Sequence, residues 1–306
     1  MTDDEPNLIT IETSPRNAHT DPETGMRFYR FQGRDLPSVT SLRRMAGVPH
    51  GLVSWQLSRV VDRATAETET LSAMLNRPRR PREHADKLDA KRRREAGTWL
   101  RAAATEERDA SSALGTAVHD AASRDLTPDT LPDPFEFTKD GKAVSIPAAD
   151  IAPRLAQYRD WLRASKVEVV AAEFQIANLT LGYAGSCDLL VRFPTGSLWI
   201  VDIKTGKGTY PEHALQVAAY RHGEVVFRDE VVDERLTGLL HRATGLAVLH
   251  LADDGWTFSA LRETEALWEA FVGLHAFAMW AHENTDMSGL VYGSRSGSVE
   301  MEAIAA

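Results

Sequence analysis

The spacing of apolar and polar residues changes along the chain from a helical period to a strand period. Between residues 65 and 122 the chain is rich in Ala, Glu, Arg and Leu, and its prolines are confined to Pro78 and Pro81, which predicts helices broken by one basic turn. Shorter helices are predicted at 41–46, around 55–61, and at 152–162 with an end near Ser165. We therefore expect the first half of the chain to be mainly helical.

Strand patterns dominate the second half, after a connecting segment that contains Pro128, Pro132 and Pro134. Consecutive strands are predicted at 167–177, 185–193 and 197–204, with a tight turn at 194–196. A short helix at 214–221, a hairpin of strands at 245–251 and 256–261, and a strongly apolar helix at 263–281 follow. Near the N-terminus the pattern predicts a short strand at 26–31 and a turn at 33–35.

These elements predict four segments along the chain. They are a mobile arm at 1–25, a helical region at 26–125 that leads into the core, a core at 126–283 that ends in the hairpin and helix, and a loose tail at 284–306. The arm is polar and contains prolines, and the tail is rich in Gly and Ser. The fold class that follows is α/β, with a mixed sheet flanked by helices and preceded by the helical region.

The composition is that of a globular protein. Of the 306 residues, 43% are hydrophobic and 26% are charged, which argues against wholesale disorder. No stretch approaches the ~18 consecutive apolar residues of a membrane-spanning helix, and the acidic start of the chain is unlike a signal peptide. We expect a soluble, cytoplasmic protein with no membrane partner.

The net charge of -9 argues against nonspecific coating of nucleic acid by the whole surface. A local excess of positive charge nevertheless lies between Arg77 and Arg101, and it includes the consecutive residues Arg92, Arg93 and Arg94. A run of this kind is either a solvated helix face or a surface that follows phosphates. Under the second interpretation, Arg92, Arg93 and Arg94 are candidates for DNA binding.

Cysteine usage limits the metal chemistry. Cys187 is the single cysteine, so the chain has no internal disulfide, no four-cysteine zinc site and no four-cysteine iron-sulfur cluster. Any metal must bind mainly to oxygens or imidazoles.

Acidic residues gather on the three predicted central strands. Asp188 lies on the second strand and Asp202 near the end of the third, and antiparallel pairing across the tight turn brings the two carboxylates together. Asp202 and Lys204 share one face of the pleat. With Glu173, these carboxylates suit magnesium, which prefers oxygen ligands and bridges to phosphate. An Asp-x-Lys triplet also arises by chance, so its order among other motifs decides its meaning.

Four short motifs follow one another along the chain. They are Gly115-Thr116-Ala117-Val118-His119, Gly185-Ser186-Cys187-Asp188, Asp202-Ile203-Lys204-Thr205-Gly206 and Gln216-Val217-Ala218-Ala219-Tyr220. Their order resembles the PD-(D/E)XK nuclease superfamily, and more specifically its RecB-like and phage-exonuclease branch, which has Gly-x-x-Asp, Asp/Glu-x-Lys-Thr-Gly and Gln-x-x-x-Tyr motifs, preceded by a helix with a Gly and a His. Because only one cysteine is present, the chain resembles the branch without an iron-sulfur cluster.

The resemblance implies a restriction-endonuclease-like core and assigns roles to individual residues. Asp188, Asp202, Lys204 and Glu173 are implied to be catalytic. The implied metal ligands are His119, Glu173, Asp188, Asp202 and the Ile203 carbonyl, for Mg²⁺ with Mn²⁺ as a substitute. Gln216, Tyr220 and Thr205 are implied to hold DNA or to order the site. His119, Gln216 and Tyr220 also have an ordinary interpretation, as packed or solvated residues of amphipathic helices.

The implied function is a metal-dependent DNA exonuclease of phage-type recombination or DNA processing, acting in the host cytoplasm if the gene is carried by a phage. Recombination proteins and single-strand-binding proteins are candidate partners. One alternative is a structure-specific or single-strand endonuclease. Another alternative is a nuclease fold that binds DNA or a partner without catalysis. Intact Asp188, Asp202 and Lys204 weigh against the second alternative, because paired carboxylates repel phosphate unless a metal is bound.

Overall fold

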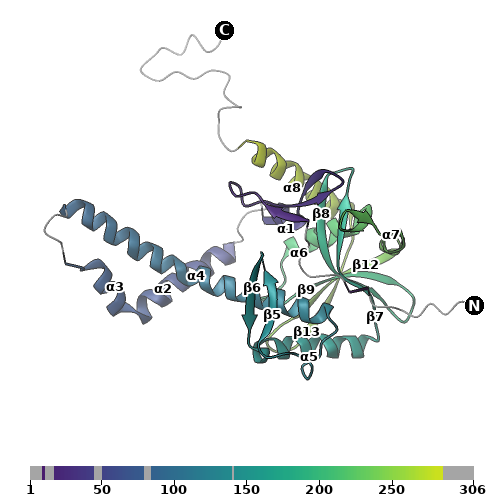
Figure 1. The fold of residues 1–306 in the computed structure, drawn as a ribbon, viewed down its shortest axis with the longest axis horizontal. Helices are drawn as coiled ribbons and strands as arrows, with labels where there is room; N and C mark the ends of the chain where they lie inside the picture. The colour runs from purple at the N-terminus through teal and green to yellow at the C-terminus, as the bar shows by residue number, and fades with distance from the viewer. Residues whose placement is uncertain (1–8, 11–16, 45–49, 79–83, 140, 285–306) are drawn as a thin grey trace, which may run out of the picture.

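The computed structural model describes residues 9–10, 17–44, 50–78, 84–139 and 141–284 of the chain (Figure 1). Most of the predicted mobile arm and nearly all of the predicted tail lie outside the described residues. One part of the segment predicted as a mobile arm is a strand, since β2 (Ala18–Thr20) pairs with β3 (Arg27–Phe31). β3 in turn pairs with β4 (Arg34–Pro37). The division of the chain into four segments stays a prediction.

A mixed sheet forms the centre of the protein. Its order is β11-β10-β7-β8-β9-β12-β13, and β1 (Ile9–Thr10) pairs in parallel with β7. The strands are β7 (Glu168–Asn178), β8 (Tyr183–Arg192), β9 (Leu198–Lys204), β10 (Val225–Arg228), β11 (Val231–Val232), β12 (Ala243–Leu251) and β13 (Trp256–Leu261). The pairs β7–β8, β8–β9 and β12–β13 are antiparallel, and β9–β12 is parallel. The three predicted central strands and the predicted hairpin are thereby confirmed.

Helices cover both faces of the sheet, because successive residues of each strand point to opposite sides. On β9, Ile200 packs in a cluster with α1 (Val39–Arg44), α6 (Pro211–Arg221), α7 (Glu234–His241) and α8 (Glu265–Glu283). Val201 packs on the other face with α5 (Ala148–Ser165) and the C-terminal part of α4 (Ala85–Ser123). This arrangement confirms the α/β fold class with a mixed sheet flanked by helices.

An elongated helical arm projects from this core (Figure 1). It consists of α2 (His50–Ala66), α3 (Thr68–Leu75) and the first part of the 39-residue α4. Ion pairs join the two long helices, such as Arg59 with Glu107 at 3.4 Å. The predicted helices are confirmed, but the chain also breaks at Glu67, between α2 and α3, which the pattern did not predict. Residues 79–83 of the predicted basic turn lie outside the described residues.

Several short elements were missed by the pattern. The supposed connecting segment after residue 125 contains the hairpin of β5 (Phe135–Lys139) and β6 (Lys142–Ile146). Phe135 and Phe137 are buried while Glu136 is exposed, so the strand alternation was present, but the flanking prolines concealed it. The elements β4, β10, β11 and α7 were also missed, since each is too short for a period to develop. Within the described part of the chain, no helix is long and apolar enough to cross a membrane.

The parallel pair β9–β12 depends on a glycine. Gly245 lies opposite Trp199, and a Cβ atom at this position would lie 2.1 Å from the indole ring. By contrast, a Cβ atom on Gly238, which is exposed within α7, would meet no atom within 4 Å.

We predict that Gly245→Ala lowers the free energy of unfolding by about 1–3 kcal/mol, the usual cost of overpacking. Gly238→Ala is the matched control and should raise the free energy of unfolding by up to about 1 kcal/mol, because alanine favours the helix. Urea denaturation of the three proteins measures both effects. Equal stability of the Gly245→Ala protein and the unaltered protein would contradict the close packing of Trp199.

Candidate metal centre

The predicted site residues come from three neighbouring strands and one helix. Glu173 lies on β7, Asp188 on β8, Ile203 on β9 and His119 on α4. The helix crosses the sheet on the face that also carries α5.

The first of these strands changes direction at Glu173. Ala172 packs on the α4 side of the sheet and Phe174 on the α6 side, although residues two apart in a regular strand share a face. Glu173, between them, has a φ of 49°, in the left-handed region that side chains other than glycine rarely adopt. Strained backbone of this kind is retained mainly where function or surrounding structure demands it.

The neighbouring strand makes the same change at Asp188. Cys187 packs on the α6 side and Leu189 on the α4 side. The β7–β8 register pairs the residues that flank the two carboxylates, so Glu173 and Asp188 lie opposite each other. The irregularity therefore brings two carboxylates to one point within the sheet.

His119 lies at the centre of the resulting group. Its Nδ1 atom is 3.2 Å from Glu173 Oε1 and 3.5 Å from Asp188 Oδ1, and its Nε2 atom is 3.1 Å from the Ile203 carbonyl oxygen. The Ile203 amide donates a hydrogen bond of 2.6 Å to Asp188 Oδ2. Donor atoms of His119, Glu173 and Asp188 all lie within 4.8 Å of one another, a grouping that is able to hold a metal ion.

Asp202 and Lys204 form a second pair beside this group. The Lys204 Nζ atom lies 2.5 Å from Asp202 Oδ2. Asp202 is 0% exposed, and apart from the Lys204 ammonium its carboxylate oxygens have no hydrogen-bond partner among the described residues. Asp202 is not a member of the group that lies within 4.8 Å. A buried carboxylate without hydrogen-bond donors is costly unless a cation is near.

Burial and mutual charge shift the pKa values of the histidine and the three carboxylic acids in the site. Burial alone would lower the pKa of His119, but the charges of Asp188 and Glu173 outweigh it and raise that pKa well above its usual value. Burial also opposes ionisation of Asp188, yet His119 and Lys204 lower its pKa below the ordinary range. Burial raises the pKa of Glu173, and it raises the pKa of Asp202 to about 6 despite the opposing charge of Lys204.

The donor set fits a hard divalent cation. It offers carboxylate oxygens, one backbone carbonyl and one imidazole, which suit Mg²⁺ or Mn²⁺ better than a soft metal. The His119 side chain is 21% exposed, compared with 13% for Glu173 and 8% for Asp188, so His119 is the side chain of this group most accessible to solvent.

A glycine lets α4 approach the strands closely enough for His119 to reach them. A Cβ atom on Gly115 would lie 3.0 Å from the Thr205 Oγ1 atom. Gly115 and His119 are four residues apart and therefore share one helix face. The Gly-x-x-x-His spacing thus has a physical reason, and Thr205 acts here as a packing partner of α4.

The second motif glycine serves the helix on the opposite face. A Cβ atom on Gly185 would lie 2.8 Å from the Tyr220 ring. Tyr220 and Gln216 are buried on α6, and the Gln216 amide donates a hydrogen bond of 2.6 Å to the Tyr220 hydroxyl. Tyr220 therefore lies against the back of β8, and Gln216 contacts Tyr220. This placement favours a role in ordering the site over direct contact with DNA.

The three consecutive arginines differ in their surroundings. The Arg92 guanidinium donates hydrogen bonds to Asp89, at 2.9 Å, and to the Arg77 carbonyl. Arg92 is therefore held within the helical arm, whereas Arg93 and Arg94 are exposed. Their roles in DNA binding stay predictions.

Two residues near the site were not singled out from the sequence. The Ser186 hydroxyl donates a hydrogen bond of 3.4 Å to Glu173 Oε2, and its position inside the Gly-x-x-Asp motif was the available signal. His213, on α6, is buried and accepts a hydrogen bond of 3.1 Å from the Tyr210 amide. No motif pointed to His213.

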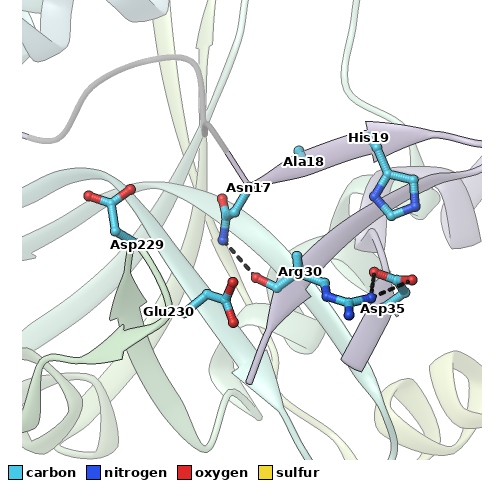
Figure 2. A pocket seen from close by; sticks show the side chains of 7 residues that line it. All are labelled: Asn17, Ala18, His19, Arg30, Asp35, Asp229 and Glu230. Carbon is cyan, nitrogen blue, oxygen red and sulfur yellow. Dashed lines mark hydrogen bonds and ion pairs between the residues drawn. The ribbon is translucent and has the colours of Figure 1, made fainter. Parts of the chain in front are cut away.

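A cavity of about 520 Å³ lies elsewhere, between the β2–β3–β4 sheet and the β10–β11 turn (Figure 2). It is lined by Asn17, Ala18, His19, Arg30, Asp35, Asp229 and Glu230. Inside it, Arg30 pairs with Asp35 at 3.0 Å, and Asn17 donates to the Arg30 carbonyl. None of the predicted site residues lines this cavity.

The fold is α/β, with a mixed sheet flanked by helices as in a restriction-endonuclease-like core, and it carries a cluster of side chains that could hold a metal ion. The model of the PD-(D/E)XK nuclease superfamily matches residues 82–223, a segment that contains every residue of the cluster. The solved structure titled "Crystal structure of SSO0001" is similar, with 15% identity, coverage of 44% of this chain and 61% of that chain, and a TM-score of 0.28. No curated protein matches the sequence.

The position of His213 generates a prediction about pH. Burial, together with the positive charges of Lys204, Arg43 and His250, lowers the pKa of His213 to about 3. An unfolded histidine has a pKa of about 6.5, so between these values the unfolded state binds more protons than the folded state. The stability that His213 contributes is therefore fully present above the unfolded pKa and is lost as the pH falls.

We predict that His213→Gln loses less stability than the unaltered protein when the pH falls from about 7 to about 5. Glutamine keeps an acceptor for the Tyr210 amide but has no proton to bind in this range. Thermal denaturation of both proteins across that range gives the difference, in which all other titrating groups cancel. Parallel curves would mean that His213 is not held neutral in the folded protein.

Proposed function

We propose that this protein is a metal-dependent nuclease that hydrolyses phosphodiester bonds in DNA. The observation that carries the proposal is the group of His119, Glu173, Asp188 and the Ile203 carbonyl, which lies beside the Asp202–Lys204 pair within the segment that matches the PD-(D/E)XK superfamily. Each of these residues had been implied by the family motifs.

The residues that would hold a divalent cation are His119, Glu173 and Asp188, with Asp202 and the Ile203 carbonyl beside them. A cation bound there would lower the pKa of a coordinated water and neutralise charge on the scissile phosphate. Mg²⁺ is the ion we propose, with Mn²⁺ as a substitute, because the donors are mostly oxygens.

Lys204 supplies the remaining positive charge. Its side chain is 18% exposed, and its ammonium group lies against Asp202. From this position it is able to donate a hydrogen bond to a phosphate oxygen and to stabilise the charge that develops in the transition state. Asp202 in turn fixes the ammonium, and the Ile203 amide fixes Asp188.

We further propose an exonuclease of the RecB-like and phage-exonuclease branch, acting in recombination or DNA processing. The order and spacing of the motifs around Asp188, Lys204 and Tyr220 support this assignment. A recombination or single-strand-binding protein is the expected partner.

Substitutions should separate ligands from other catalytic groups. Asp188→Asn and Asp202→Asn should each abolish cleavage and weaken Mg²⁺ binding, because each removes a negative charge from the cluster. Lys204→Ala should keep Mg²⁺ binding while the cleavage rate falls by about 10² to 10³, as when one transition-state donor is lost. Calorimetry and cleavage rates are measured on the same preparations.

The matched control is Asp129→Asn, which changes an exposed carboxylate outside the cluster and should leave both quantities unaltered. Full activity of Lys204→Ala, or normal Mg²⁺ binding by both aspartate variants, would contradict the proposed mechanism.

The exonuclease assignment predicts a preference for DNA ends. Linear duplex should be degraded in the presence of Mg²⁺, and a covalently closed circle of the same sequence should resist. Gel analysis of both substrates over time measures the two rates. Equal rates would assign the protein to the endonucleases instead.

A further inference from the structure

One face of α4 carries basic and hydroxyl side chains at alternating intervals of four and three residues. Its basic members are Lys87, Lys91, Arg94, Arg101 and Arg108. Thr98, Thr105 and Ser112 occupy the intervening positions. Residues at this spacing lie on one side of a helix of 3.6 residues per turn, and all eight are exposed. We call this set the basic stripe.

The basic stripe leads to the metal centre. The same alternation continues through Gly115 and ends at His119. At a rise of 1.5 Å per residue, Arg108 lies about 16 Å along the helix from His119, Arg101 about 27 Å, Arg94 about 37 Å and Lys87 about 48 Å.

A further cation joins the stripe where it meets the core. Lys139, at the end of β5, donates a hydrogen bond of 2.7 Å to the Ser112 hydroxyl. A strand on the opposite side of the helix from α2 therefore adds positive charge to the same line.

Most acidic residues of α4 lie off the stripe and pair with the rest of the arm, while Glu95 and Asp109 stand at the edge of the stripe, at the same spacing. Glu106 pairs with Arg63, and Glu107 pairs with Arg59. Within the stripe, Arg108 is 3.0 Å from Asp109 and Lys91 is 3.9 Å from Glu95. Lys87 and Arg94 have no carboxylate partner among the residues that the structure describes.

A solvated helix face does not account for this distribution. Like charges three and four residues apart destabilise a helix, and solvated faces usually alternate in sign. In a protein of net charge -9, a helix face with five exposed cations along about 32 Å, against the two carboxylates of Glu95 and Asp109, is net positive and complementary to a polyanion.

We propose that the basic stripe is a track for the phosphates of the DNA segment that flanks the scissile bond. This inference rests on the proposed nuclease function and specifies its substrate. The substrate is a duplex with one end at His119 that continues along the helical arm. At 3.4 Å per phosphate on each strand, the length of the track corresponds to about 14 base pairs. Arg92 is not part of this track, since it lies on the opposite face of α4 and contacts Asp89.

The test uses DNA length to locate each contact. Blunt hairpins with stems of about 6 and about 24 base pairs, which extend about 20 Å and about 80 Å, are compared as ligands. The distal variant is Lys87→Gln with Arg94→Gln, and the proximal variant is Arg101→Gln with Arg108→Gln. The control, Arg163→Gln with Arg235→Gln, makes the same charge change at exposed positions outside the arm. Glutamine keeps helix propensity close to that of arginine and lysine.

Binding is measured by fluorescence anisotropy in chelator, so that the result is independent of cleavage. The distal variant should bind the long hairpin about tenfold more weakly and lower its salt slope by about 1.8, since two phosphate contacts are lost. It should bind the short hairpin within about twofold of the unaltered protein. The proximal variant should weaken both complexes, and the control variant neither.

Unaltered binding of the long hairpin by the distal variant would overturn the proposed track. An equal loss of affinity for both hairpins would also overturn it, because such a result indicates a general charge effect. Failure of the nuclease function looks different. In that case the unaltered protein with Mg²⁺ leaves linear duplex intact, whatever the pattern of binding.

Discussion

Three carboxylates enclosed between strands of one sheet set the constraint to which the rest of the structure responds. Glu173, Asp188 and Asp202 are largely removed from solvent, and each buried charge costs several kcal/mol unless it is compensated. The protein compensates them incompletely. His119 serves Glu173 and Asp188, the Ile203 amide serves Asp188, and Lys204 serves Asp202. A divalent cation bound at this group would supply the positive charge that the arrangement lacks.

His119 reaches the carboxylates because α4 approaches one face of the sheet closely, and α6 approaches the other face as closely. Gly115 allows α4 to lie against Thr205, and Gly185 allows Tyr220 of α6 to lie against β8. A methyl group at either position would push its helix outward. If α4 moved outward in this way, His119 would withdraw from Glu173. A small displacement is enough to break the contact between these two side chains. The motif glycines therefore control distances within the site although they carry no functional group.

Much of the fold followed from periodicity, and much of the site followed from the order of its motifs. The long segments, such as the three central strands and α5, have enough residues for a period to emerge. Short elements such as β10 and α7 do not, and tertiary packing determines them. The grouping of His119 with Glu173 and Asp188 was predictable only as a family expectation. The left-handed backbone at Glu173 was not predictable from the sequence, because it arises from the way β7 and β8 pair around the two carboxylates.

A net charge of -9 and the track for a polyanion that we propose on the basic stripe are compatible because of screening. At physiological salt the Debye length is about 8 Å, which is less than the diameter of one helix with its side chains. Acidic groups on the remote face of the molecule therefore contribute little to the potential along α4. Neighbouring cations of the basic stripe are three to seven residues apart, or about 5 to 10 Å along the axis, so their fields overlap. The potential that a phosphate meets on the arm is thus set by the local line of charge, and the acidic remainder limits binding elsewhere on the surface.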